Sequence, residues 1–167
     1  YFKLDRTDEA IQALEKALSM KPGESATTEV IGKAYFGRGI ALLSGKQYAA
    51  AIQALLKAKD YNPKNGYIFY NLAEAYIFQK KYPDAEQALN QAMGLMPKSA
   101  DVYGRLGFVC EKQKKWDLAL SAYKKADEIR KSIGITVPIP EDSPSIMNAL
   151  MQAVLIRNVG VQQAAAE

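Results

Sequence analysis

The chain has 167 residues, a net charge of +4, no histidine and one cysteine. This composition excludes disulfide frameworks and most zinc, histidine and cysteine–histidine chemistry, so we expect no metal and no other cofactor. No stretch approaches the roughly 18 apolar residues that span a bilayer, and no signal peptide opens the chain, so we expect no membrane insertion. The basic residues are scattered near predicted helix ends, which favours a solvated rim over a nucleic-acid surface.

The first predicted helix carries a stripe of small, large and small side chains. Ala10 is followed by Leu14 and Ala17, and Pro22 lies five residues further on. This spacing places the three side chains on one helix face, and the proline ring cannot continue the helix. The stripe recurs at Ala51, Leu55 and Ala58, at Ala85, Leu89 and Ala92, and at Ala119, Tyr123 and Ala126. Alanine at these positions predicts the close approach of a second helix.

A further helical pattern precedes each of the three later stripes. Each pattern has an aromatic residue and, four residues later, a small residue that leaves room for a neighbouring helix. These pairs are Tyr35 and Gly39, Phe69 and Ala73, and Tyr103 and Gly107. Short turns join each pattern to its stripe, which predicts antiparallel helical hairpins. The stripes advance by 34 residues, from Ala51 to Ala85 to Ala119.

In this period and pattern the chain resembles the tetratricopeptide repeat family from Tyr1 to about Lys131. The resemblance implies an all-α fold, a right-handed superhelical array of antiparallel helix pairs, or α-solenoid. Two departures from the pattern predict changed helix limits. The interval from Pro22 to Pro63 is seven residues longer than the period, so we expect the next helix to begin early, near Ser25. Lys131 replaces the terminating proline of the last unit, so we expect that helix to end at about Ser132, before Gly134.

The predicted organisation is a truncated first repeat, three further repeats and a C-terminal extension. The expected segments are 1–22, the second helix of the truncated repeat; 23–65, repeat 2 with an extended first helix; 66–99, repeat 3; 100–133, repeat 4; 134–143, a proline-rich linker; 144–160, a C-terminal helix; and 161–167, a tail. The compartment stays open: a cytoplasmic location is favoured, and a periplasmic one requires an export signal upstream of Tyr1.

The expected C-terminal amphipathic helix, residues 144–160, carries one apolar stripe. We expect it to cap the exposed face of the last repeat, as stacked repeats require at their ends. The alternative is that it enters a groove of its own chain or of a neighbour. It then acts as an autoinhibitory segment or makes the chain a structural self-assembly module that forms homo-oligomers.

The resemblance places a peptide-binding groove on the first helices of the hairpins, on the face turned away from the partner helix. Aromatic and aliphatic side chains dominate this face, and exposed apolar patches usually mark interaction sites. The candidate groove residues are Lys33, Phe36, Ile40, Tyr67, Tyr70, Asn71, Glu74, Ile77, Phe78, Arg105, Phe108 and Lys112. Asn71 is expected to bind a peptide backbone through paired hydrogen bonds. The alternative is that Phe36, Tyr70 and Phe108 pack between adjacent units.

The expected function is a non-catalytic adaptor or scaffold that binds a largely hydrophobic peptide or helix of another protein. Within this family, a clamp for the acidic C-terminal tails of heat-shock chaperones requires lysines and asparagines at fixed groove positions. Only Asn71 and Arg105 suit that clamp. The unsuited residues at clamp positions are Phe36, Ile40, Tyr67 and Asp101. An enzyme is not expected, because the groove carboxylates lack a catalytic partner or a phosphate-binding glycine loop.

Overall fold

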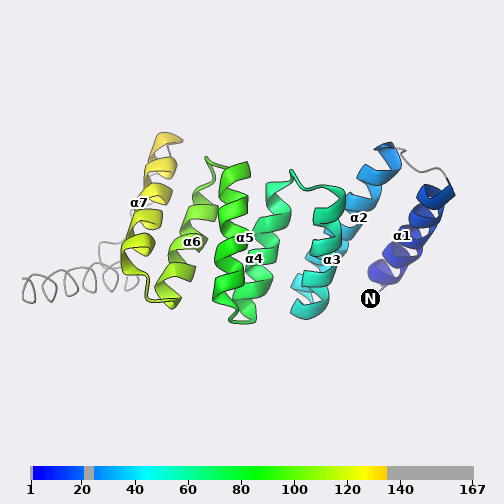
Figure 1. Ribbon diagram of the computed structural model, residues 1–167, viewed down its shortest axis with the longest axis horizontal. Coiled ribbons are helices and arrows are strands. Elements are labelled where there is room, and N and C mark those ends of the chain that lie inside the picture. The colour runs from blue at the N-terminus through cyan, green and yellow to red at the C-terminus, as the bar shows by residue number, and fades with distance from the viewer. Residues whose placement is uncertain (1, 21–24, 135–167) are drawn as a thin grey trace, which may run out of the picture. The chain divides into compact units, whose positions relative to one another are not determined.

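The computed structural model describes residues 2–20 and 25–134, and every regular element in these ranges is an α-helix (Figure 1). The helices are α1 (Phe2–Met20), α2 (Ser25–Ser44), α3 (Tyr48–Tyr61), α4 (Gly66–Phe78), α5 (Tyr82–Leu95), α6 (Ala100–Lys112) and α7 (Trp116–Ser132). Residues 135–167 lie outside the described residues. The predicted C-terminal helix, its capping role and its alternative role in oligomers therefore stay predictions.

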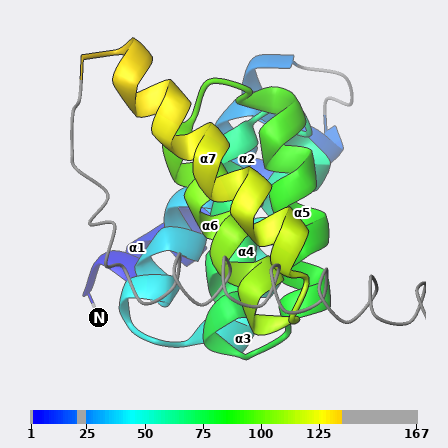
Figure 2. The ribbon, with the colours of Figure 1, turned by 90° about the vertical axis from the view of Figure 1, so that its left-hand side faces the viewer.

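The chain forms two compact units, Tyr1–Leu95 and Met96–Glu167. In the first unit each helix packs against the next one along the chain, from α1 to α5. In the second unit α6 packs against α7. Figures 1 and 2 show α2 with α3, α4 with α5, and α6 with α7 as antiparallel neighbours. The predicted all-α fold of antiparallel helix pairs is confirmed.

Close helix packing in the hairpins depends on glycines that face large side chains. A Cβ atom added at Gly39 would lie 2.6 Å from Leu55 Cγ, and one added at Gly107 would lie 2.7 Å from Tyr123 Cδ1. These distances are shorter than the nonbonded contacts that Cβ atoms make, so an alanine at either position would force Leu55 or Tyr123 to shift. The small-against-large packing predicted from the sequence is confirmed at both positions.

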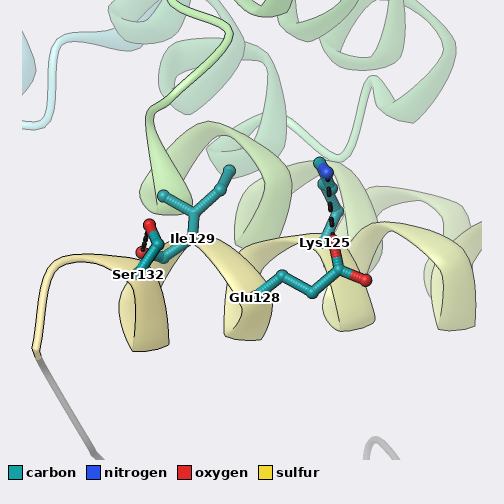
Figure 3. Close-up of polar contacts among 4 residues, drawn as sticks. All are labelled: Lys125, Glu128, Ile129 and Ser132. Atoms are coloured by element: carbon teal, nitrogen blue, oxygen red, sulfur yellow. Dashed lines mark hydrogen bonds and ion pairs between the residues drawn. The ribbon is translucent and has the colours of Figure 1, made fainter.

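The predicted limits of two helices match the structure. α2 begins at Ser25 and α7 ends at Ser132, and Gly134 follows with a φ of +74°. The last turns of α7 are held by side chains: Ser132 Oγ donates to the Ile129 carbonyl at 2.7 Å, and Lys125 Nζ lies 3.0 Å from Glu128 Oε2 (Figure 3). Arg130 and Lys131 lie in the last turn, where positive charge favours the helix dipole.

Each hairpin turn contains a lysine in the left-handed backbone region. Lys46, Lys80 and Lys114 have φ angles of 59°, 58° and 60°. The three lysines are 34 residues apart, so the backbone repeats with the same period as the buried stripes. This conformation reverses the chain within three residues and allows the next helix to run antiparallel to the previous one.

Tyr35 joins three helices of the first unit. Its ring stacks on Tyr61 of α3, with centroids 6.0 Å apart, and its hydroxyl donates to Glu15 Oε1 of α1 at 2.7 Å. Burial, followed by the hydrogen bond to Glu15, raises the pKa of the Tyr35 phenol to about 12. The phenol therefore keeps its proton in the folded chain at pH values where an unfolded tyrosine loses it.

We expect Tyr35→Phe to lower the stability of the first unit by about 1 kcal/mol at neutral pH, because the hydrogen bond to Glu15 is lost. The raised pKa makes this difference pH-dependent. The phenol's contribution is complete below pH 10 and disappears as the pH rises toward 12, because the unfolded chain deprotonates first. Urea unfolding of both proteins between pH 8 and pH 12 measures the difference, and a constant gap over this range contradicts the prediction.

Candidate functional site

The structure places nine of the twelve candidate groove residues in the first compact unit. They lie on α2 and α4, two first helices of hairpins that also contact each other directly. We call the side of these helices that carries the nine residues the α2–α4 face. Its residues are Lys33, Phe36, Ile40, Tyr67, Tyr70, Asn71, Glu74, Ile77 and Phe78. The remaining three, Arg105, Phe108 and Lys112, lie on α6 in the second unit.

The α2–α4 face exposes large apolar side chains. Ile40 is 39% exposed, Tyr67 is 64% exposed and Phe78 is 57% exposed. The side chains of Phe36, Tyr70 and Ile77 are half-buried. They are neither fully exposed nor part of the core. The core side of the same helices carries other residues, among them Tyr35, Leu42, Ile68, Phe69 and Leu72. Both helices are therefore apolar on two sides, and the described residues cover the core side more completely than the α2–α4 face.

The first turn of α4 is fixed by two asparagines. Asn65 precedes the helix, and its Oδ1 accepts a hydrogen bond from the Tyr67 backbone N–H at 3.0 Å, which is an N-cap. Asn71 Nδ2 donates to the Tyr67 carbonyl at 2.7 Å, one turn back along the same helix. One amide hydrogen of Asn71 therefore binds α4 itself, and this bond orients the side chain.

Phe78 has a packing contact that the sequence pattern does not indicate. Its ring stacks on Tyr48, the first residue of α3, with centroids 4.8 Å apart and planes inclined by 8°. Stacked rings at this distance contribute to stability beyond their buried area. Phe78 therefore combines an exposed edge with a structural contact between α3 and α4, which makes it a less direct probe of binding than Tyr67.

Charge on the α2–α4 face is balanced locally. Lys33 forms an ion pair with Glu29 one turn earlier on α2, and both side chains are exposed. The hydrogen bond and the positive charge of Lys33 lower the pKa of Glu29. Glu74 adds a half-buried carboxylate on α4. Among the nine residues of the α2–α4 face, the charged ones are Lys33 and Glu74, so their formal charges cancel.

The corresponding part of α6 is more basic. Arg105 and Lys112 are exposed, and Lys112 Nζ lies 5.1 Å from the centroid of the half-buried Phe108 ring, in cation–π geometry. On the same helix Glu111 accepts a hydrogen bond from the Tyr123 hydroxyl of α7 at 3.1 Å. Burial, together with the charge of Glu111, raises the pKa of Tyr123. Glu111 thus links α6 to α7 and supports the hairpin.

Two models of the family described as "Tetratricopeptide repeat" match this chain. One covers residues 42–93, and the other covers residues 1–66 and 70–132. The chain belongs to the tetratricopeptide repeat family. The family match spans the described helices, and it agrees with the 34-residue period and with the glycine positions that allow the hairpins to pack.

Solved structures of other tetratricopeptide repeat domains share this fold. The first TPR of Spaghetti (RPAP3), bound to the HSP90 peptide SRMEEVD, is 21% identical with a TM-score of 0.61, over 75% of this chain and 93% of that one. The Sgt2 TPR domain of Aspergillus fumigatus is 21% identical with a TM-score of 0.58, over 81% and 83%. MamA of Desulfovibrio magneticus RS-1 is 23% identical with a TM-score of 0.59, over 78% and 70%. No curated protein sequence matches the chain.

Among the described residues of this tetratricopeptide repeat chain, no group of three or more carboxylate or cysteine side chains is arranged to hold a metal ion. The only cysteine of the sequence, Cys110, is buried in α6. None of the described helices has the length and apolar character that a membrane crossing needs.

Proposed function

We propose that this tetratricopeptide repeat chain is a non-catalytic protein-interaction module that binds a largely hydrophobic peptide or helix of a partner protein on the α2–α4 face. The observation that carries the proposal is the exposure of Ile40, Tyr67 and Phe78 on helices whose other side already forms the core. The free energy falls when a partner covers an apolar surface of this kind and removes it from water. The Spaghetti (RPAP3) domain, which was solved with a peptide bound, supports peptide binding as a use of this fold.

Tyr67 is the side chain on which we expect binding to depend most. It is the most exposed of the three apolar residues, and the N-cap and Asn71 hold its backbone in place. A rigid tyrosine supplies apolar contact area together with a hydroxyl that can bind a polar group at the edge of the interface. Asn71, one turn further along α4, is placed to bind a peptide backbone with the amide atoms that do not bind Tyr67.

The proposed ligand is apolar because the α2–α4 face does not favour carboxylates. Lys33 is paired with Glu29, and Glu74 places a carboxylate on the same face. Phe36 and Ile40 provide apolar side chains where a clamp for acidic tails needs polar ones. On α6, in the second compact unit, Arg105, Phe108 and Lys112 form a separate candidate surface that carries two basic groups.

A peptide-display selection tests this proposal. The 167-residue chain is used to select binders from a random peptide library, and calorimetry then measures the Kd of the enriched peptides. We expect these peptides to be rich in apolar residues, and we expect Tyr67→Ala and Ile40→Ala to weaken binding about tenfold or more, as for central interface residues. Leu118→Ala is the matched control, because Leu118 is 56% exposed but lies on the second helix α7.

Two results would contradict the proposal. Equal losses of affinity in Tyr67→Ala and Leu118→Ala would show that the α2–α4 face has no special role. Tight binding of SRMEEVD, the acidic peptide present in the Spaghetti (RPAP3) structure, would show that charge rather than apolar contact selects the ligand. We expect that peptide to bind about tenfold more weakly, or worse, than the selected apolar peptides.

A further inference from the structure

Asn65 is the only asparagine of the chain that is followed by glycine. The six asparagines are Asn62, Asn65, Asn71, Asn90, Asn148 and Asn158, and the residues after them are proline, glycine, leucine, glutamine, alanine and valine in that order. Because glycine has no Cβ, its backbone nitrogen approaches the side-chain carbon Cγ of a preceding asparagine without steric hindrance. Asn65 and Gly66 are therefore the pair at which an asparagine amide reacts with the backbone most readily.

The structure places this pair in the turn between α3 and α4. The Asn65 N–H donates to the Asn62 carbonyl at 3.3 Å, and the Asn65 carbonyl accepts from the Ile68 N–H at 3.1 Å. The Asn65 side chain is half-buried, so part of it is in contact with water. Gly66 is the first residue of α4, where the helix supplies no carbonyl for the backbone N–H. The Gly66 nitrogen is therefore not held by the hydrogen bonds that run along α4.

The N-cap of α4 slows the reaction between the two residues. Asn65 Oδ1 accepts from the Tyr67 N–H at 3.0 Å, and this hydrogen bond fixes the plane of the side-chain amide. The Gly66 nitrogen must meet Cγ from above that plane, so the amide has to rotate and the hydrogen bond has to break. Gly66 is also buried, which keeps base away from its N–H. The reaction therefore proceeds when the first turn of α4 opens, as helix ends do more readily than helix centres.

We propose that Asn65 is a site of spontaneous deamidation and that its isoaspartate product weakens ligand binding on the α2–α4 face. In the first step the Gly66 nitrogen bonds to Cγ of Asn65 and the Cγ–Nδ2 bond breaks. Nδ2 leaves as ammonia, with the proton that the Gly66 nitrogen has lost. Water then opens the five-membered succinimide ring. Cleavage of the bond from this nitrogen to Cγ gives aspartate, whereas cleavage of its bond to the main-chain carbonyl carbon gives isoaspartate.

The two products have opposite effects on the N-cap. Aspartate keeps it, because its carboxylate accepts from the Tyr67 N–H and negative charge is favourable at a helix N-terminus. In isoaspartate the main chain runs through Cβ and Cγ, so the backbone is one carbon longer and the former Oδ1 is a main-chain carbonyl oxygen. The cap is then lost, and Tyr67 is no longer held in place. The effect on binding rests on the function proposed above, because it requires Tyr67 to contact the ligand.

The modification site is tested without any ligand. The 167-residue chain is incubated at 37 °C and pH 8, and mass spectrometry of its proteolytic fragments measures the conversion of each asparagine. We expect at least tenfold more conversion at Asn65 than at Asn71 or Asn90, which lie within helices. A synthetic peptide of residues 61–69 lacks the folded N-cap, so Asn65 should convert about tenfold more slowly in the chain than in the peptide. Equal conversion at the three asparagines, or none at Asn65 when the peptide has converted completely, overturns the proposal.

The effect on binding is tested with the separated products. Chromatography isolates the isoaspartate form, and calorimetry measures its Kd for a selected apolar peptide. We expect this form to bind at least tenfold more weakly than the unmodified chain, whereas Asn65→Asp should stay within about twofold, because only the isoaspartate form loses the cap. Asn65→Ser is the matched control, since serine also caps a helix but has no amide to lose, and its affinity should not change during incubation.

The outcomes separate this proposal from the function proposed above. Equal affinity of the isoaspartate form and the unmodified chain overturns the effect on binding. Equal weakening in Asn65→Asp also overturns it, because charge rather than the altered backbone is then the cause. If no apolar peptide binds the unmodified chain, the proposed function fails and the effect on binding fails with it. The conversion measured at Asn65 then still decides the modification site by itself.

Discussion

Gly39→Ala should destabilise the first unit, whereas Gly37→Ala in the same helix should stabilise it. The Cβ of an alanine at position 39 would lie 2.6 Å and 2.7 Å from Leu55 Cγ and Cδ2, and Leu55 is completely buried. Overpacking of this kind costs about 1–3 kcal/mol. The better helix propensity of alanine returns about 0.5–1 kcal/mol. We therefore expect a net loss of about 1–2 kcal/mol for Gly39→Ala.

Gly37 provides the control for this experiment. It is exposed, and an added Cβ would meet nothing within 4 Å. Only the gain in helix propensity then remains, so Gly37→Ala should raise the stability by about 0.5–1 kcal/mol. Urea unfolding followed by circular dichroism measures both changes. If both substitutions stabilise the chain, helix propensity alone determines their effect. That result would contradict the close packing of α2 against Leu55 of α3.

Leu55→Ala should cause a larger loss, about 2–5 kcal/mol, because the removed side chain is completely buried and leaves a cavity. Leu95→Ala serves as the comparison. Leu95 is 40% exposed at the end of α5, so we expect its change to stay within about 0.5 kcal/mol. Equal losses of unfolding free energy in the two variants would contradict the complete burial of Leu55 in the structure.

The double variant with alanine at positions 39 and 55 tests whether the two residues interact directly. The clash at Gly39 disappears when Leu55 is shortened, and the new methyl group fills part of the cavity. We expect the double variant to be more stable than the sum of the single losses predicts, with a coupling in the range of about 0.5–3 kcal/mol for residues in contact. If the two losses of stability simply add in the double variant, the two side chains do not interact.

The hairpins were predictable from the sequence because their packing depends on local spacing. A small residue such as Gly39 or Gly107 and a large residue such as Leu55 or Tyr123 recur at fixed intervals, and the structure places them in contact. The early start of α2 and the late end of α7 followed from the position of prolines and glycine. These features need no knowledge of distant contacts.

Other features were not predictable because they depend on contacts that the repeat does not specify. The stacking of Phe78 on Tyr48 joins the end of one helix to the start of another, outside the periodic pattern. The left-handed lysines of the turns, Lys46 among them, carry no conformational signal of the kind that glycine gives. The bond from Asn71 to its own helix also depends on a rotamer that spacing does not determine.

The candidate site residues and their use as a binding surface both remain proposals. Spacing indicated which residues lie away from the partner helix, and Ile40 and Tyr67 are exposed apolar residues in the structure. The division of the chain after Leu95 was not predicted, and it separates the α6 residues Arg105, Phe108 and Lys112 from the others. Sequence spacing within a repeat gives no information on where one compact unit ends.

The most direct test of the proposed binding surface is to map where a selected apolar peptide binds, by NMR chemical-shift changes in the isotope-labelled chain. We predict that the largest changes fall on α2 and α4, at Ile40, Tyr67 and Asn71, with small changes at residues of α3 and α5 that point away from this face. Changes concentrated on the second helices α3 and α5, with the α2–α4 face unaffected, would contradict it.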